Sequence, residues 1–254
     1  MKRYIGGLNN MKSQAMIEFQ GGGAADKTVL QGFTLAEVLI TLGVIGIVAA
    51  MTLPALITRN QNKALEESLK KNYSVILQAF DMYQAEHGKR LRPEILGGGN
   101  EATGLKAQIM PYFNTIADCG LYSNNHPACI PYTGTSNNPY KTFNGHPAGL
   151  TLFDDGQFVL ADGSLILIEN TRTNPYIYLT VDVNGRNKTP NKWGHDLFSF
   201  QIMNDGQILP VGAPGTGYSK KNVYCSITST ADRNGIGCTY YAINDKFYFN
   251  NLPK

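Results

Sequence analysis

A glycine and a glutamate lie five residues apart where a long apolar run begins, and their chemistry suggests a cleavage site and an ion pair. The residues Gly32-Phe33-Thr34-Leu35-Ala36-Glu37 lead into 38–58, a stretch of 21 residues without a charge. As a helix this stretch would span about 32 Å, enough to cross a bilayer core of about 30 Å. A cut between Gly32 and Phe33 would create a cationic amine near the Glu37 carboxylate. At low dielectric the two charges would attract strongly.

Glu37 also has a role that requires no processing. Thr34 and Glu37 fit the S/T-x-x-E pattern of a capping box, and Glu37 would face the positive end of the helix dipole. A carboxylate costs roughly 3 kcal/mol at the bilayer centre and less near its edge. Local physics therefore leaves two interpretations open, a helix cap at headgroup level and a charge that is paired during assembly.

The same residues resemble the prepilin cleavage and methylation motif of type IV pilins and type II secretion pseudopilins. The resemblance implies that a prepilin peptidase cuts after Gly32 and methylates Phe33. It implies that Glu37 guides assembly with other pilin or pseudopilin subunits at an inner-membrane assembly platform. It further implies a bacterial inner-membrane protein with a single pass through the lipid bilayer and a C-terminal domain exported to the periplasm or cell surface.

Helix-weakening residues lie inside the apolar run. Pro54 removes one helical hydrogen bond, and Gly43 and Gly46 lower the helix propensity of the same stretch. The resemblance implies that the stretch between Gly46 and Pro54 partly unwinds when subunits pack. The alternative is that a membrane helix simply tolerates these residues.

Residues 1–32 are expected to be a leader peptide outside the mature fold, with Met11 and Met16 as alternative starts. A competing export signal would end at Ala50, because Val48-Ala49-Ala50 has the small-residue spacing of an ordinary signal peptidase site. Glu37 would interrupt the apolar region of such a signal. The sequence of the mature amino terminus distinguishes the two.

Charge and motifs exclude several classes of function. The chain of 254 residues has a formal net charge of +3, and removal of residues 1–32 leaves 18 basic and 17 acidic side chains. This balance gives no electrostatic argument for nucleic-acid binding. The four histidines lie outside any metal or nucleophile motif, and G-x-S-x-G, P-loop and H-E-x-x-H patterns are absent from the sequence. The sequence therefore predicts neither an enzyme nor an organic cofactor.

Four cysteines, Cys119, Cys129, Cys225 and Cys238, follow the apolar run. An even count in an exported domain suggests disulfides. The favoured pairing joins Cys119 to Cys129 and Cys225 to Cys238, although three pairings are formally open. A zinc site is a weaker alternative because neither pair has the close spacing of zinc ligands.

Beyond Thr58, apolar residues recur at steps of three and four from Leu65 to Tyr83, which predicts that the helix continues in amphipathic form and ends near Gly88. The predicted organisation is a leader (1–32), a transmembrane and filament-core helix (33–58), its amphipathic continuation (59–90) and an exported globular domain (91–254).

Residues 104–148 are expected to form an exposed loop region, and a β pattern follows them. Asp-Gly turns between short apolar runs predict an antiparallel sheet of four or five strands packed on the helical spine, an α+β fold with disulfide-closed loops. The expected strands are 150–153, 157–161, 164–169, 176–183, 197–203 and 207–209, with a further candidate at 239–243.

An oxygen-rich loop at 182–196 is the main candidate for a cation site. Calcium takes six to eight oxygen ligands, and Asp182, Asn184, Asn187 and Asp196 offer side-chain oxygens. The loop departs from the EF-hand pattern, and Asx turns that merely hold a long loop are the alternative. The resemblance supports calcium, because certain pseudopilins bind it in a nearby loop.

The sequence as a whole predicts a structural subunit of a type IV pilus or of a filament like the type II secretion pseudopilus. The alternative is a membrane-anchored adhesion module that does not polymerise and that grips a surface through Tyr- and Asn-rich loops at about 119–146. The resemblance covers secretion, motility, adhesion and DNA-uptake systems alike, and both major and minor subunits.

Overall fold

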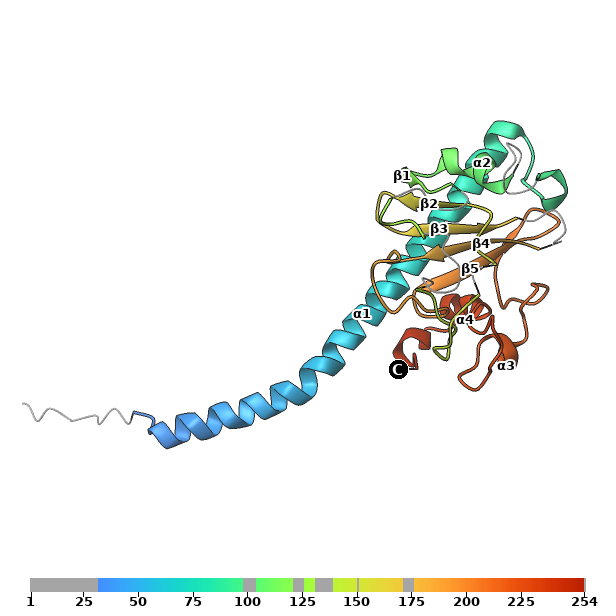
Figure 1. Ribbon diagram of the computed structural model, residues 1–254. Coiled ribbons are helices and arrows are strands. Elements are labelled where there is room, and N and C mark those ends of the chain that lie inside the picture. Colours follow the sequence, from blue (N-terminus) through green and yellow to red (C-terminus); the bar gives the residue numbers. More distant parts are fainter. Residues whose placement is uncertain are drawn as a thin grey trace, which may run out of the picture. The chain divides into compact units, whose positions relative to one another are not determined.

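The computed structural model describes residues 32–97, 104–120, 126–130, 139–149, 151–170 and 176–253. The chain divides into two compact units, Met1–Ala49 and Ala50–Lys254. In its described part, the first unit contributes the beginning of one long helix, and the second unit contains the rest of that helix and a β-sheet (Figure 1). The α+β fold class predicted from the sequence is confirmed.

Helix α1 (Leu35–His87) has 53 residues and continues without interruption through Pro54. It begins after Thr34, whose hydroxyl accepts a hydrogen bond from the Glu37 N–H at 3.2 Å. It ends before Gly88, which has φ +68° and donates its N–H to the Gln84 carbonyl at 2.9 Å. Glycine adopts this left-handed conformation without a Cβ penalty. The predicted end of the helix near Gly88 is therefore confirmed.

Within the second unit, α1 buries one face against the sheet (Figure 1). Leu69, Ile76, Phe80 and Tyr83 are at most 7% exposed and share a core with apolar side chains of the sheet. Burying each such side chain stabilises the fold by roughly 1.5–3 kcal/mol. The amphipathic pattern that predicted this half of the helix therefore corresponds to a real packing face.

The described residues form a six-stranded antiparallel sheet in which every strand pairs with its neighbours in the sequence. The predicted number of four or five strands was too low: five of the six expected segments, from 157–161 to 207–209, contain strands, and β1 was not foreseen. The strands are β1 (Thr115–Asp118), β2 (Gln157–Leu160), β3 (Leu165–Glu169), β4 (Ile177–Asp182), β5 (Leu197–Ile202) and β6 (Ile208–Pro210). Short helical segments surround the sheet: η1 (Pro93–Ile95), α2 (Leu105–Ile109), η2 (Met110–Tyr112), α3 (Lys221–Tyr224), α4 (Cys238–Asn244) and η4 (Tyr248–Asn250).

Both faces of the sheet are covered. Every residue of β2, β3, β4 and β5 is buried, polar residues such as Thr180 and Ser199 included, because these strands are covered on both faces. One face packs on α1. The other packs on side chains from irregular segments, among them Tyr140, Phe153, Trp193 and Ile236. The described residues therefore form two large cores, one on each side of a single sheet, and a small third cluster of Phe143, Cys225 and Cys238.

Three further expectations were wrong for the described residues. The region 104–148 is not simply an exposed loop, because it contains α2 and β1 and buries Tyr140 at 1% exposure. Residues 151–153 form a turn that places Leu152 and Phe153 in the second core. Residues 239–243 belong to α4, a helix whose buried positions Cys238, Thr239 and Ala242 follow helical spacing.

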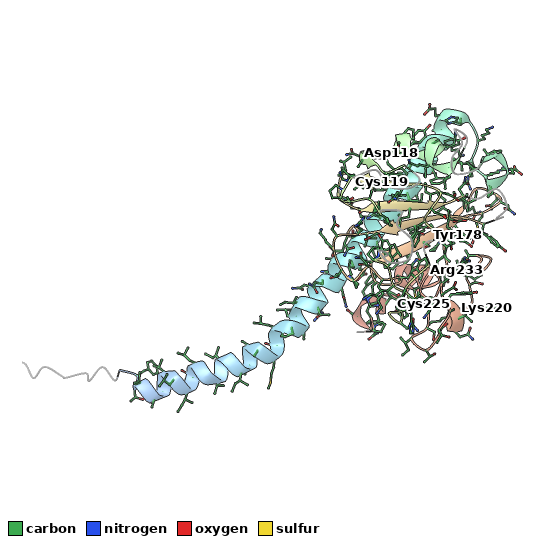
Figure 2. All side chains as sticks on the ribbon, in the orientation of Figure 1. Asp118, Cys119, Tyr178, Lys220, Cys225 and Arg233 are labelled. Atoms are coloured by element: carbon green, nitrogen blue, oxygen red, sulfur yellow. A yellow bond between two sulfur atoms is a disulfide. The ribbon has the colours of Figure 1, made fainter. Side chains whose placement is uncertain are left out.

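The structure contains the two disulfides that the sequence favoured. Cys119 pairs with Cys129 at a Cα–Cα distance of 5.6 Å, and Cys225 pairs with Cys238 at 4.8 Å. Figure 2 shows Cys119 beside β1 and Cys225 in the part of the domain that carries α3 and α4. Closing loops of this size stabilises a fold by roughly 3 kcal/mol each in the chain-entropy model.

Candidate functional site

The start of α1 is a complete capping box. The Oε2 atom of Glu37 accepts hydrogen bonds from the Thr34 N–H at 2.8 Å and from the Thr34 hydroxyl at 2.9 Å. The Thr34 hydroxyl in turn accepts the Glu37 N–H. This reciprocal arrangement satisfies two of the N–H groups that a helix start leaves without partners. It also holds the Glu37 carboxylate on Thr34, the residue that follows Phe33. A cut after Gly32 would create the new amine on Phe33.

Gly32 and Phe33 are open to an external enzyme. Phe33 is 89% exposed, and a Cβ atom built on Gly32 would meet no other atom within 4 Å. Neither crowding nor a left-handed backbone therefore demands a glycine at this position.

The first half of α1 exposes many apolar side chains, and contact of such a surface with water is unfavourable. Leu39 is 61% exposed, Ile45 63% and Met51 76%, and Figure 2 shows side chains projecting all along this stretch of the helix. Among the described residues, α1 is the one helix long and apolar enough to cross a membrane. A surface of this extent requires lipid or other helices around it.

Gly46 and Pro54 leave the helix unbroken in the single chain. A Cβ atom on Gly46 would meet no other atom within 4 Å, so no contact with the described residues requires this glycine. The Thr58 hydroxyl donates a hydrogen bond to the Pro54 carbonyl at 3.0 Å. The predicted unwinding concerns packed subunits, and it stays a prediction.

The loop at residues 182–196, here called the acidic loop, brings two buried carboxylates together. Asp182 accepts hydrogen bonds from the Tyr140 hydroxyl at 2.8 Å and from the N–H groups of Asn184 and Gly185. Asp196 accepts the N–H groups of Asn191 and Lys192 at 2.8 and 2.6 Å. Both aspartates are 0% exposed. Asp182 therefore forms the Asx turn of the alternative interpretation, whereas Asp196 accepts N–H groups of residues that precede it in the chain.

Ionising both carboxylates of the acidic loop is nevertheless costly. Burial raises the pKa of Asp182 to about 7, and the charge of Asp196 adds to the rise, although Tyr140 and two N–H donors act in the opposite direction. Burial likewise raises the pKa of Asp196 to about 6. Two buried acids that resist ionisation favour a neutralising partner, which is either a proton or a cation.

Amide oxygens of the same loop could help to hold a cation. The Oδ1 atoms of Asn184 and Asn191 are buried and accept no hydrogen bond from the described residues. Buried acceptors are normally paired, so two unpaired ones in one loop fit the oxygen chemistry of calcium. Asn187, the fourth predicted ligand, instead directs its Nδ2 atom to the Pro127 carbonyl at 3.4 Å.

Two residues that contribute to the acidic loop, Tyr140 and Asn191, were not predicted from the sequence. Tyr140 lies 42 residues from Asp182, and no spacing pattern could connect them. Asn191 carried a signal that was available, since asparagine after proline often adopts unusual backbone conformations. Its φ of +51° makes it a non-glycine residue with a left-handed backbone.

A second acidic cluster lies outside the predicted loop. Single carboxylate oxygens of Asp154, Asp155 and Glu169 lie within 4.8 Å of one another. Asp155 accepts the Asn170 N–H at 2.7 Å, and burial raises the pKa of Asp154, with a further contribution from the charge of Asp155. The sequence suggested only a turn at Asp154 and Asp155, because the return of β3 is what brings Glu169 to them.

The capping box, the open glycine and the exposed apolar helix form one continuous segment, and comparison with known families points to the same segment. Residues 31–53 match the prokaryotic N-terminal methylation motif. The match is consistent with a type IV pilin or pseudopilin and supports a type IV pilin-like precursor. This motif defines a structural, pilin-type segment and not an enzyme family. No curated protein and no solved structure matches the chain.

Proposed function

We propose that this chain is a structural subunit of a type IV pilus or of a filament like the type II secretion pseudopilus. The observation that carries the proposal is the position of the methylation motif at the start of a helix whose large apolar side chains are exposed in the described part of the chain. In lipid, and later among the helices of other subunits, that surface stays away from water. Extraction from the membrane into a filament then exchanges one apolar environment for another.

The proposed mature chain begins at Phe33 with a methylated amine. Residues 33–58 form the membrane and filament-core segment, 59–90 the amphipathic continuation and 91–254 the exported domain. Mass spectrometry of protein from its native host tests this directly. We expect a chain that begins at Phe33 and carries one additional methyl group. A mature chain in which Gly32 and Phe33 remain joined, or one that begins at Met51, would refute it.

Glu37 is proposed to pair with a terminal amine during assembly. Glu37→Ala should leave cleavage intact, because the peptidase acts at Gly32, and should lower incorporation into sheared filaments, because the apolar helix loses its charged contact. Glu66→Ala is the matched control, since Glu66 lies on the same helix and pairs only with Lys70 one turn away. Equal incorporation of the Glu37 and Glu66 variants would contradict the role of Glu37.

Shearing of cells distinguishes the proposed filament subunit from the alternative, an adhesion module that does not polymerise. A filament subunit should be released with sheared fibres, whereas a module that never assembles should remain with the membranes. Of the loop region at about 119–146 that such a module would use, residues 121–125 and 131–138 lie outside the described residues.

We further propose that the acidic loop binds calcium. Asp182 and Asp196 would supply charge, and Asn184 and Asn191 would supply their unpaired amide oxygens. The ion would neutralise the two buried carboxylates and fasten the loop to β4 and β5, between which it lies in the sequence. Asn187 is left out of this set, because its side chain points to Pro127.

A further inference from the structure

A groove lies on α1 where the apolar run gives way to polar residues. Its volume is about 620 Å³, and it is lined by one face of the helix together with two residues of a distant segment. The lining residues are Met51, Pro54, Ala55, Thr58, Arg59, Asn62, Phe249 and Asn250. They combine an apolar end within the membrane-length run with a polar end just beyond it.

Arg59 is the first charged residue after Glu37 along the helix. It is exposed and forms no ion pair with the described residues, and none of the groove's lining residues is acidic. The next basic residue, Lys63, differs in that it faces Glu67 at 3.8 Å. The groove therefore presents an uncompensated positive charge at the end of an apolar segment.

A segment far along the chain is fastened to the same place. The Asn62 side chain donates a hydrogen bond to the Phe249 carbonyl at 2.8 Å. The Phe249 ring is buried in the core that α1 shares with the sheet. Two residues earlier, Phe247 is 54% exposed, and the Lys246 ammonium lies 4.8 Å from the centre of its ring. Asp245, the acidic residue of this segment, accepts the Phe247 N–H at 2.9 Å.

An exposed aromatic ring beside basic groups is the composition found at membrane–water interfaces. A basic side chain near an anionic lipid surface contributes about 1 kcal/mol of attraction. We propose that Arg59 and residues 246–250 form an interfacial docking surface for anionic phospholipid headgroups, which holds the exported domain on the bilayer before assembly. The charge of Arg59, the absence of acidic residues in the groove lining and the position at the end of the apolar run select lipid as the occupant. The proposal rests on the membrane anchoring in the proposed function.

Fluorescence quenching by lipids with brominated acyl chains tests the docking surface in the full chain. The only tryptophan, Trp193, is fully buried and gives a constant background. A Phe247→Trp variant in phosphatidylcholine nanodiscs that contain phosphatidylglycerol should be quenched clearly more than an Ile116→Trp variant. Ile116 is the matched control, because it is also exposed, at 60%, but lies on the edge strand β1. Quenching should weaken when phosphatidylglycerol is omitted.

Charge variants identify the headgroup contact. Adding Arg59→Gln to the Phe247→Trp variant should lower the ratio of docked to undocked molecules about fivefold, the factor that corresponds to one surface charge. Lys63→Gln should have little effect because Glu67 already compensates Lys63. Equal effects of the two charge variants, or no change on omitting phosphatidylglycerol, would overturn the headgroup contact.

Flotation with lipid vesicles separates failure of the docking surface from failure of the anchor. If the protein floats with vesicles and Phe247→Trp is quenched no more than the control, the docking surface is refuted and the membrane anchor stands. If the protein does not float, the anchor itself fails. If the Phe247→Trp fluorescence is protected from quenching to the same degree in detergent and in brominated lipid, a second copy of the chain covers the groove. This outcome also overturns the proposal.

Discussion

Calcium should stabilise the exported domain, because the ion would neutralise two carboxylates that the fold buries completely. Asp182 and Asp196 are both 0% exposed, and their raised pKa values show that the metal-free domain disfavours two negative charges there. An ion that binds only the folded state adds about 2.7 kcal/mol of stability at 100 times its Kd. In a domain of about 200 residues each kcal/mol raises Tm by roughly 2–4 °C, so the expected rise is about 5–10 °C.

Thermal unfolding followed by Trp193 fluorescence measures this rise in the detergent-solubilised full chain. Trp193 belongs to the second core and lies within the acidic loop, so its emission reports the loss of the relevant packing. Melts are compared in EDTA and in excess calcium at pH 8, where the carboxylates are available to the ion. Asp182→Ala should abolish the rise in Tm.

The matched control for the calcium prediction is Asp205→Ala. Asp205 also holds a turn, through the Gln207 N–H at 2.9 Å, but this aspartate is exposed. Its replacement should leave the calcium-dependent rise intact. Identical melts of the unmodified chain in EDTA and in calcium would refute the site. A rise that persists in Asp182→Ala would place the ion elsewhere.

Three further predictions concern stability and can be measured by urea unfolding. In EDTA, the free energy of unfolding should fall as pH rises from about 4 to about 7. In this range the acidic-loop carboxyls stay protonated in the folded state but lose their protons in the unfolded chain. A rise in the free energy of unfolding over this range would contradict the raised pKa values. Replacing Cys225 and Cys238 by Ser should cost roughly 3 kcal/mol, and an unchanged urea midpoint would contradict it. Gly212→Ala should destabilise by about 1–3 kcal/mol, since φ is +102° and the new Cβ would lie 2.0 Å from the Gly237 carbonyl oxygen. Gly149→Ala, with an ordinary backbone and its nearest neighbour at 4.0 Å, should be neutral.

The parts of the fold that the sequence predicted well are those whose signal is local. The packing face of α1 repeats at helical spacing from Leu69 to Tyr83, and Gly88 marks its end. Asp-Gly turns separate β2 from β3 and precede β6 in the same manner. The motif at Gly32 to Glu37 is likewise local, and its capping box has the hydrogen bonds that its residue spacing implies.

The parts that the sequence did not predict depend on partners distant in the chain. Strand β1 has four residues that alternate between partly buried and exposed, and only its pairing with β2 defines it. Helix α4 contains Thr239, Tyr240 and Tyr241, residue types that favour strands. The packing of Ala242 in the core that α1 shares with the sheet, together with the disulfide of Cys238, overrides that preference. The contact of Tyr140 with Asp182 depends in the same way on tertiary structure.

The order of the strands has a consequence for how the exported domain reaches its final state. Because each strand pairs with its sequence neighbours, the sheet can grow hairpin by hairpin along the chain. The second core, however, needs Val211 and Ile236, which follow all six strands. The apolar side chains on that face of the sheet therefore stay exposed until the last fifth of the chain has folded onto them and Cys225 has paired with Cys238. Formation of the Cys225–Cys238 disulfide would then lock a domain whose sheet has already formed.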